Sequence, residues 1–382
     1  MNIGTVALFN DKNKKELAKY LFEILKVNHK KIEGRQKIEK EILQPILQQV
    51  IDCNKESKFN LLKYIDFEDI SFDGIKIEHT NLEGTNAKIN PQTVCGKSLH
   101  GTNLTGINLE YADFAGVEIC YAKLEGTNAK INPQTLRYKS LEGANLKGLN
   151  LEAADFADVC IKKANLEGTK ANIDPQTVYD RSIFDTNLKG LNLEAVDFAD
   201  VEIRRANLEG TKANIDPQTV RDNNLEGANL KGLNLAAADF AGVFIRGAIL
   251  EGTSANIDPQ TLYYKSLRDA NLTGLNLAAA NFEDVFIGGA NLKGTKAKIN
   301  PQTVRDKNLV GANLTGLDLL GKDFSGVDIK DTILEDTGAI INIRTVLNCS
   351  ELEQNEKKGY YIFEEEEELT EIKGFILKKL TR

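Results

Sequence analysis

Aspartate recurs on a 42-residue interval along this 382-residue chain. Asp113, Asp155, Asp197, Asp239 and Asp323 follow the interval, and Asn281 takes the one remaining place. Carboxylates stacked on one side of a protein could ligate a divalent cation. An Asp or Asn can instead close a tight turn with a hydrogen bond to the local backbone. The Asp-to-Asn exchange favours the turn over the metal site.

A second recurring set is basic. Its members share one place in the repeat and are Lys97, Lys139, Arg181, Lys265 and Lys307. The spacing of the surrounding apolar residues puts this place on the inside, where an unpaired charge would be costly. We expect a local two-residue insertion to turn these side chains outward. A specific anion site is the alternative.

The other residues with catalytic potential form no recognised arrangement. His29, His79 and His100 stand apart from any recurring Ser, Cys or carboxylate pattern. The sequence contains neither a GxxxxGK[ST] loop nor an HExxH motif. Five cysteines without a CxxC pair are typical of free thiols in a reducing compartment. We therefore predict no enzyme activity, no cofactor and no metal site.

The composition narrows the function classes further. The chain is 41% hydrophobic and 27% charged, and no apolar run approaches the roughly 18 residues of a membrane-spanning helix. The first residues do not resemble a secretory signal, so we expect a cytoplasmic protein. A net charge of −8 argues against direct binding to nucleic acid, which requires a basic surface.

The element that positions all these residues is an internal repeat. Six of the seven prolines lie 42 residues apart in the motif Ile-(Asn/Asp)-Pro-Gln-Thr; they are Pro91, Pro133, Pro175, Pro217, Pro259 and Pro301. A degenerate seventh copy covers residues 341–345. A fixed period of this length makes the chain a repeat protein rather than two or three unrelated domains.

Between the proline motifs, a large apolar residue returns every five positions. Leu141, Leu146, Leu151 and Phe156 are one such run. Seven steps of five and one of seven make each 42-residue unit, so the proline motif is a two-residue insertion. Inward residues at this spacing imply a corner at every pentad. Four corners close one coil, so a coil takes four pentads and each unit holds two coils.

The five-residue segments carry a family resemblance. Residues 144–148 (ANLKG), 154–158 (ADFAD) and 164–168 (ANLEG) resemble the A(D/N)LXX signature of the pentapeptide-repeat family. The resemblance covers residues 62 to 346 and implies an all-β solenoid, a right-handed quadrilateral β-helix. Counting the central residues predicts about 14 coils, which at ~4.8 Å per coil extend roughly 65 Å.

The two ends of the chain depart from the repeat. We predict a helical N-terminal cap over residues 1–56, the β-helix over 57–350 and a C-terminal cap over 351–382. The N-terminal cap should hold two helices, with Pro45 kinking the second or marking its start. In the C-terminal cap we expect a strand at 359–363 and an amphipathic helix from Leu369 to Leu380. The family resemblance makes this last helix a candidate homodimer contact.

Charge divides the predicted solenoid into unlike sides. The side with the Phe pentads and the proline loops carries 15 acidic and five basic residues, a net −10, whereas the neighbouring side carries a net +4. We expect the loops to be exposed. The candidate partner-binding surface therefore consists of the six repeat prolines with Asp113, Asp155, Asp158, Asp197, Asp200 and Asp239.

Two functions follow from this surface. The first is a non-enzymatic scaffold whose acidic, loop-bearing side binds a protein partner. The second rests on the resemblance, because some family members mimic DNA and occupy type II topoisomerases (DNA gyrase and topoisomerase IV), changing drug sensitivity. Duplex DNA of ~65 Å would carry on the order of 38 charges, so mimicry here would be partial. An exported effector is a third reading, which the missing signal disfavours.

Overall fold

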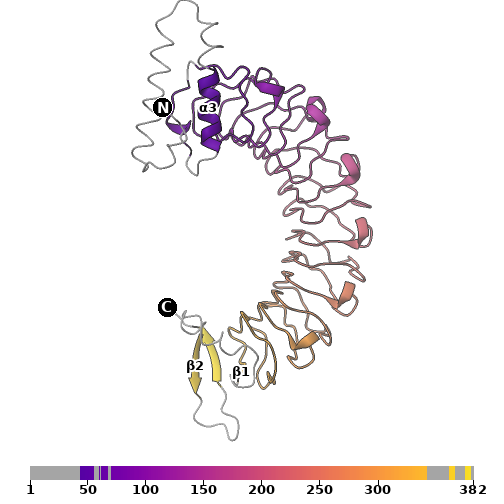
Figure 1. Ribbon diagram of the computed structural model, residues 1–382. Coiled ribbons are helices and arrows are strands. Elements are labelled where there is room, and N and C mark those ends of the chain that lie inside the picture. Colours follow the sequence, from indigo (N-terminus) through magenta and orange to yellow (C-terminus); the bar gives the residue numbers. More distant parts are fainter. Residues whose placement is uncertain are drawn as a thin grey trace, which may run out of the picture. The chain divides into compact units, whose positions relative to one another are not determined.

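The computed structural model describes residues 44–55, 60, 62–67, 70–341, 361–365 and 375–379. The chain divides into two compact units, one of residues 1–182 and 186–191 and the other of residues 183–185 and 192–382. Helix α3 opens the described part of the first unit, and short 3-10 turns recur along both units (Figure 1). Within the described residues, no helix combines the length and the apolar character needed to cross a membrane.

Each pentad folds as a short extended stretch followed by a tight turn. In the pentad centred on Leu146, the N–H of Leu149 donates to the Leu146 carbonyl at 3.0 Å. The corner needs a residue with positive φ, and Gly148 supplies it at 74°. Asn145 Oδ1 accepts from the N–H of Lys147 at 3.2 Å and fixes the same corner from its other end. The sequence A-N-L-K-G therefore encodes its own turn.

Consecutive coils are joined by parallel backbone pairing. Asn145 pairs with Asn165 in the following coil and with Lys123 in the preceding one. The N–H of Leu146 donates to the Asn165 carbonyl at 2.9 Å, and the N–H of Asn165 donates to the Ala144 carbonyl at 2.9 Å. The step from Lys123 to Asn145 spans a proline motif and is longer by two positions than the step from Asn145 to Asn165. The predicted 42-residue repeat of two coils is confirmed, and the architecture is a repeat β-helix.

The inward residues form a narrow apolar core. Leu146 and Leu166 are fully buried, and Phe156 is 3% exposed. Ala171, in the neighbouring column, is 4% exposed, so small as well as large side chains fill the core. Thr169 is also buried, because its hydroxyl donates to the Leu166 carbonyl at 2.8 Å.

The short helical turns follow the repeat. In chain order they are η3 (Leu62–Tyr64), η4 (Cys95–Lys97), η5 (Pro133–Thr135), η6 (Arg137–Lys139), η7 (Tyr179–Arg181), η8 (Arg221–Asn223), η9 (Tyr263–Lys265) and η10 (Arg305–Lys307). All but η3 lie in or directly after a proline motif. The motif itself adopts 3-10 geometry at Pro133–Thr135, and in most repeats the 3-10 turn follows the motif; such turns suit runs of about three residues.

Helix α3 (Gln44–Lys55) covers the first described coil of its unit. Pro45 lies in the first turn of the helix. Of the two predicted alternatives, it therefore marks the start of the helix rather than a kink. Gln48 donates to the Lys76 carbonyl at 3.0 Å and accepts from the Lys76 N–H at 2.7 Å, so a side-chain amide satisfies the coil's backbone. The first predicted helix, near residues 10–25, lies outside the described residues.

The predicted helix from Leu369 to Leu380 is wrong where the structure describes it. Strand β3 (Phe375–Lys379) pairs antiparallel with β2 (Tyr361–Glu365) and with β1 (Ile340–Ile341), in the order β1-β3-β2. A short apolar run can form either a helix or a strand. Here the segment forms a strand because it pairs with a strand on each side. The predicted strand at 359–363 is confirmed over 361–363. The predicted dimer contact was based on a C-terminal helix, and the described part of that segment is a strand.

Because the core is narrow and closely packed, we expect truncation of a large core side chain to lower the free energy of unfolding substantially. Phe156→Ala should lower the free energy of unfolding by about 3–5 kcal/mol, because the removed ring leaves a cavity that adjacent coils hold open. Glu152→Ala, an exposed control in the preceding pentad, should change it by less than about 0.5 kcal/mol. Urea denaturation followed by circular dichroism compares them. Equal effects of both substitutions would contradict the assigned register.

Candidate functional site

The proline motif forms a rigid turn whose own side chains hold it together. In the copy at residues 131–136, Asn132 Oδ1 accepts from the N–H of Gln134 at 3.1 Å. The hydroxyl of Thr135 donates to the Asn132 carbonyl at 3.0 Å. Ile131 and Leu136 are buried on either side. The Asn thus acts as the N-cap of η5, with Pro133 directly after it.

The glutamine of the motif binds the next coil. Gln134 Nε2 donates to the Ala157 carbonyl at 2.6 Å and lies 3.5 Å from the Asp155 carbonyl. The same bond recurs, in each case to a residue 23 positions further on, at Gln92 (2.7 Å), Gln218 (2.5 Å), Gln260 (2.6 Å) and Gln302 (2.9 Å). The motif is therefore a clamp between coils.

The six repeat prolines are not exposed, contrary to the sequence-based expectation. Pro91, Pro133, Pro175, Pro217, Pro259 and Pro301 are all buried. Their rings face the interior because the insertion adds a turn that still returns an apolar side chain to the core. The outer surface of each loop consists instead of the Asn or Asp, Gln and Thr side chains. The loops remain on the candidate surface, but their prolines cannot contact a partner.

The recurring Asp side chains are exposed and close corners, as predicted. Asp113 and Asp155 each accept from the N–H two residues later at 2.9 Å, and Asp239 does the same. Asn281 makes an equivalent bond at 3.0 Å. In Asp323, the hydrogen bond from the Ser325 backbone holds the pKa of the carboxyl below its ordinary value. An Asx turn accounts for the whole column.

The recurring basic side chains point outward, also as predicted. Lys97 is exposed and donates to Gln92 Oε1 at 2.7 Å. Lys139 lies 3.8 Å from Asp158, and Lys265 lies 3.8 Å from Asp284. These bases meet carboxylates rather than one another. Their arrangement therefore offers no support for an anion site.

The acids of the same corners are partly neutralised by these contacts. Asp158 and Asp200, both exposed, occupy positions with φ of 60° and 57°. Asp200 lies 3.7 Å from Arg221. A hydrogen bond from Arg305, at 3.2 Å, lowers the pKa of Asp284. Asp197, the last of the predicted site residues, is exposed as well.

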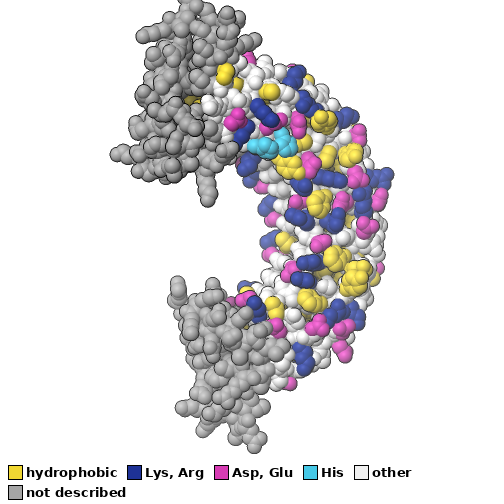
Figure 2. Space-filling model, in the orientation of Figure 1, with side chains coloured by type: hydrophobic (Ala, Val, Ile, Leu, Met, Phe, Trp, Pro, Cys, Tyr) yellow, Lys and Arg dark blue, Asp and Glu magenta, His cyan; other side chains and the backbone are white. Residues whose placement is uncertain are grey.

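The neighbouring side brings together residues that the sequence left apart. The rings of His79 and His100 have centroids 5.0 Å apart, and Tyr121 lies 5.5 Å from His100. These residues come from successive coils, and Figure 2 shows the histidines adjacent among charged and apolar side chains. The three residues are 21 positions apart along the chain, within one position of the 20 or 22 residues of a coil, and this spacing is the signal in the sequence that could have revealed the contact.

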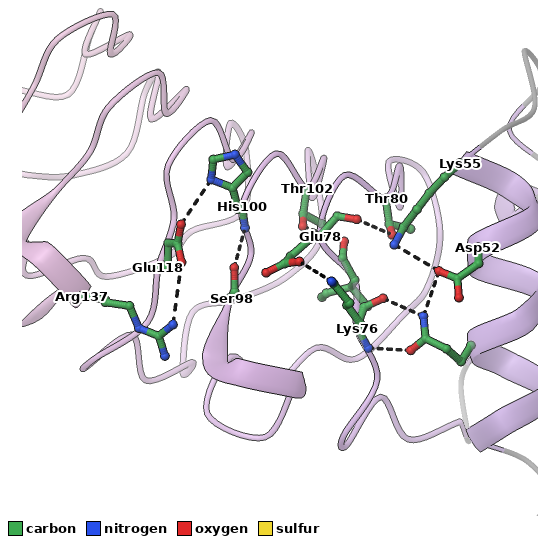
Figure 3. A network of polar contacts seen from close by, with 12 residues as sticks. Asp52, Lys55, Lys76, Glu78, Thr80, Ser98, His100, Thr102, Glu118 and Arg137 are labelled. Carbon is green, nitrogen blue, oxygen red and sulfur yellow. Dashed lines mark hydrogen bonds and ion pairs between the residues drawn. The ribbon is translucent and has the colours of Figure 1, made fainter.

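Carboxylates complete this cluster. Glu118 lies 3.3 Å from His100 Nδ1 and 3.7 Å from Arg137, so it joins two coils (Figure 3). The hydroxyl of Tyr121 donates to Glu142 at 2.7 Å, which lowers the pKa of Glu142 and raises that of Tyr121. His100 thus has a carboxylate neighbour, Glu118, that the search for recurring patterns did not identify.

The second unit also has arginine and aromatic side chains in contact with one another. The rings of Tyr263 and Tyr264 are exposed and lie 4.1 Å apart. Arg268 stacks over Phe286 at 5.7 Å and lies 3.5 Å from Asp269. The charge of Arg268 is thus balanced locally by a carboxylate, and exposed aromatic rings are present in the same unit.

Thiols and metal ligands add no further chemistry to the described residues. Cys95, Cys120 and Cys160 are free, as expected. Burial raises the pKa of the Cys120 thiol, which disfavours the reactive thiolate. Across the described ranges, no group of three or more His, Cys, Asp or Glu side chains is placed to hold a metal ion.

Two grooves in the first unit lie beside the proline loops. The first, of about 400 Å³, is lined by residues 88–90, 92 and 108–113. The second, of about 630 Å³, is lined by residues 130–132, 134 and 150–155. The two sets are one 42-residue unit apart, so the grooves are equivalent places in consecutive repeats. One wall belongs to the loop segment and the other to the next coil.

The rims of the grooves differ from the rest of the repeat. Each first-unit groove has a Lys on the loop wall and a Glu and an Asp on the opposite wall: Lys88, Glu110 and Asp113 in one, Lys130, Glu152 and Asp155 in the other. The Glu place is kept by Glu194 at the start of the second unit and is taken by Ala236, Ala278 and Leu320 in the later repeats. The frame of the loop is constant, whereas the residues that border it vary.

Comparison with known proteins places this geometry in a known class. The family model described as pentapeptide repeats matches eight copies, over residues 98–130, 140–170, 221–254, 266–296 and 308–337. No curated protein sequence matches the chain.

Two of the solved structures that match parts of the chain are as follows. One is HetL, a pentapeptide repeat protein involved in heterocyst differentiation regulation from the cyanobacterium Nostoc sp. strain PCC 7120, with 20% identity over 63% of this chain and 84% of that one and a TM-score of 0.14. Another is QnrB1, a plasmid-mediated fluoroquinolone resistance protein in a trypsin-treated variant form, with 12% identity over 76% of this chain and 93% of that one and a TM-score of 0.13.

The glutamine clamp predicts a graded loss of stability. Gln134→Ala should lower the free energy of unfolding by about 1 kcal/mol, because it leaves the carbonyl of Ala157 without its donor. Gln134→Glu should cost more, since a carboxylate cannot donate to that carbonyl. Thermal and urea unfolding measure both. If both variants are as stable as the unaltered chain, the clamp is not a structural bond.

Proposed function

We propose that this chain, which belongs to the pentapeptide-repeat family, is a non-enzymatic scaffold that binds a protein partner through its loop-bearing surface. We further propose that it acts in the cytoplasm, with about 14 four-sided coils between terminal regions 1–56 and 351–382. One observation carries the proposal. The loop backbone is fixed by identical bonds in successive repeats, whereas the side chains around it change.

That division is the pattern of a binding scaffold. Gln92, Gln134 and Gln218 all make the same bond to the next coil, so these residues serve the fold. Glu152 contributes to no such bond, and its equivalent Ala236 occupies the same place without disturbing the repeat. Residues that the fold does not require are available for recognition, and rigid elements present them accurately.

A site-specific cross-linker tests the proposal. A photoreactive phenylalanine at Ala153, an exposed groove residue whose equivalent is Tyr111, should capture one protein from the source cell. The same group at Lys147, which is 43% exposed on another side of the coil, is the matched control. We expect the cross-linker at Ala153 to capture the partner and the cross-linker at Lys147 not to capture it. Equal capture from both positions, or none from either, would count against a loop-side partner.

A DNA mimic that binds a type II topoisomerase is the second candidate. Its support is that all six predicted aspartates of the loop side are exposed. Against it, Asp158 and Asp200 face basic side chains, so the exposed charge is lower than the count of acids implies. Since a duplex carries about one charge per ~1.7 Å, the match in charge density is poor.

Charge removal without loss of the corner separates the candidates. Asp113→Asn, Asp155→Asn and Asp239→Asn together should preserve the fold, because Asn281 closes the same turn. A DNA mimic would change gyrase supercoiling activity and lose most of that effect in the triple variant. We expect no effect of either protein at micromolar concentration. Inhibition or protection that disappears in the variant would establish the mimic instead.

A further inference from the structure

We infer that the two grooves of the first unit together bind an extended, proline-rich segment with a basic residue at every third position. The inference rests on the proposed scaffold function and names the chemistry of its partner. The grooves are bordered by residues 88–92 and 108–113 in one repeat and by residues 130–134 and 150–155 in the next.

The spacing of the grooves selects the backbone of the partner. Equivalent groove residues are 42 positions apart, or two coils, which corresponds to about 9.6 Å along the stack at ~4.8 Å per coil. A polyproline II helix repeats every three residues and rises ~9.3 Å in that turn. Side chains three apart in such a segment face the same way. Each can therefore enter its own groove without strain in the partner.

The charges of the grooves select its side chains. Glu110 and Glu152 make no ion pair within the described part of the chain, and each stands three residues before an exposed aspartate, Asp113 or Asp155. Two acidic groups on the same wall of each groove are complementary to an Arg or Lys of the partner. Lys130, on the opposite wall, can donate to the partner's carbonyls, which a polyproline II helix leaves without internal bonds.

An exposed aromatic residue supports the same occupant. Tyr111 is 88% exposed on the first groove, although large apolar side chains are usually covered. Proline-rich segments dock on surfaces that carry aromatic rings, and an arginine can stack on such a ring. The equivalent place in the second groove is Ala153, which makes Tyr111→Ala a substitution that the repeat already tolerates.

The probe is a fluorescein-labelled peptide of four Arg-Pro-Pro triplets, titrated with the complete chain by fluorescence anisotropy at low and moderate salt. A peptide of three Arg-Pro-Pro-Pro units has the same length with cations four apart, and four Glu-Pro-Pro triplets reverse the charge. We expect the Arg-Pro-Pro peptide to bind saturably. At roughly the same ionic strength, the Arg-Pro-Pro-Pro peptide should bind at least fivefold more weakly, and the Glu-Pro-Pro peptide should not bind.

The protein variants are taken from the repeat itself. Glu110→Ala with Glu152→Ala reproduces the second-unit residues Ala236 and Ala278, so folding should persist, and affinity should fall about tenfold. Tyr111→Ala should weaken binding about threefold. Circular dichroism verifies that each variant is folded.

Three outcomes would overturn the inference: no saturable binding of the Arg-Pro-Pro peptide, equal binding of the two arginine registers, or unchanged affinity in the double glutamate variant. None of them affects the cross-linking test at Ala153. Capture of a protein there without peptide binding would retain the scaffold and reject this partner chemistry. Failure of both experiments would reject the scaffold as well.

Discussion

The pairing of each coil's backbone with the next coil is the constraint on which the rest of the structure depends. Leu146 meets the carbonyl of Asn165, and every neighbouring pair must keep an equivalent register. A coil made of four pentads alone does so directly. The coil that also holds a proline motif must place its two extra residues where they do not shift the ladder. The proline motif accommodates the two extra residues in a tight turn, which is a 3-10 turn at Pro133–Thr135.

This constraint explains the chemistry of the motif. Its Asn caps the turn, its Pro returns an apolar ring to the core, and its Gln bonds to the next coil. All three residues contribute contacts that hold the turn in place, and this structural role accounts for their recurrence. Residues that bind a partner are expected at positions that the coil register leaves free to vary. Glu110 and Glu152 are such residues, because three later repeats have alanine or leucine at the same place while the coils continue.

The fold could be predicted from the sequence because a five-residue apolar period is a local property of the chain. The corner role of Asp155 was equally visible, since Asn281 showed which property of the side chain matters. The burial of Pro133 was not visible, because it depends on the path of the turn. The strand at 375–379 depends on partners distant in sequence. The contact of His79 with His100 follows only once the coil length is known.

Amide hydrogen exchange tests the separation of framework from recognition surface most directly. The account predicts that Gln134→Ala accelerates exchange at Asp158 and Val159, next to the carbonyl that Gln134 binds, whereas Glu152→Ala leaves these amides unchanged. If amide exchange at these residues is accelerated equally in both variants, or is not accelerated in either, the separation of framework from recognition surface is contradicted.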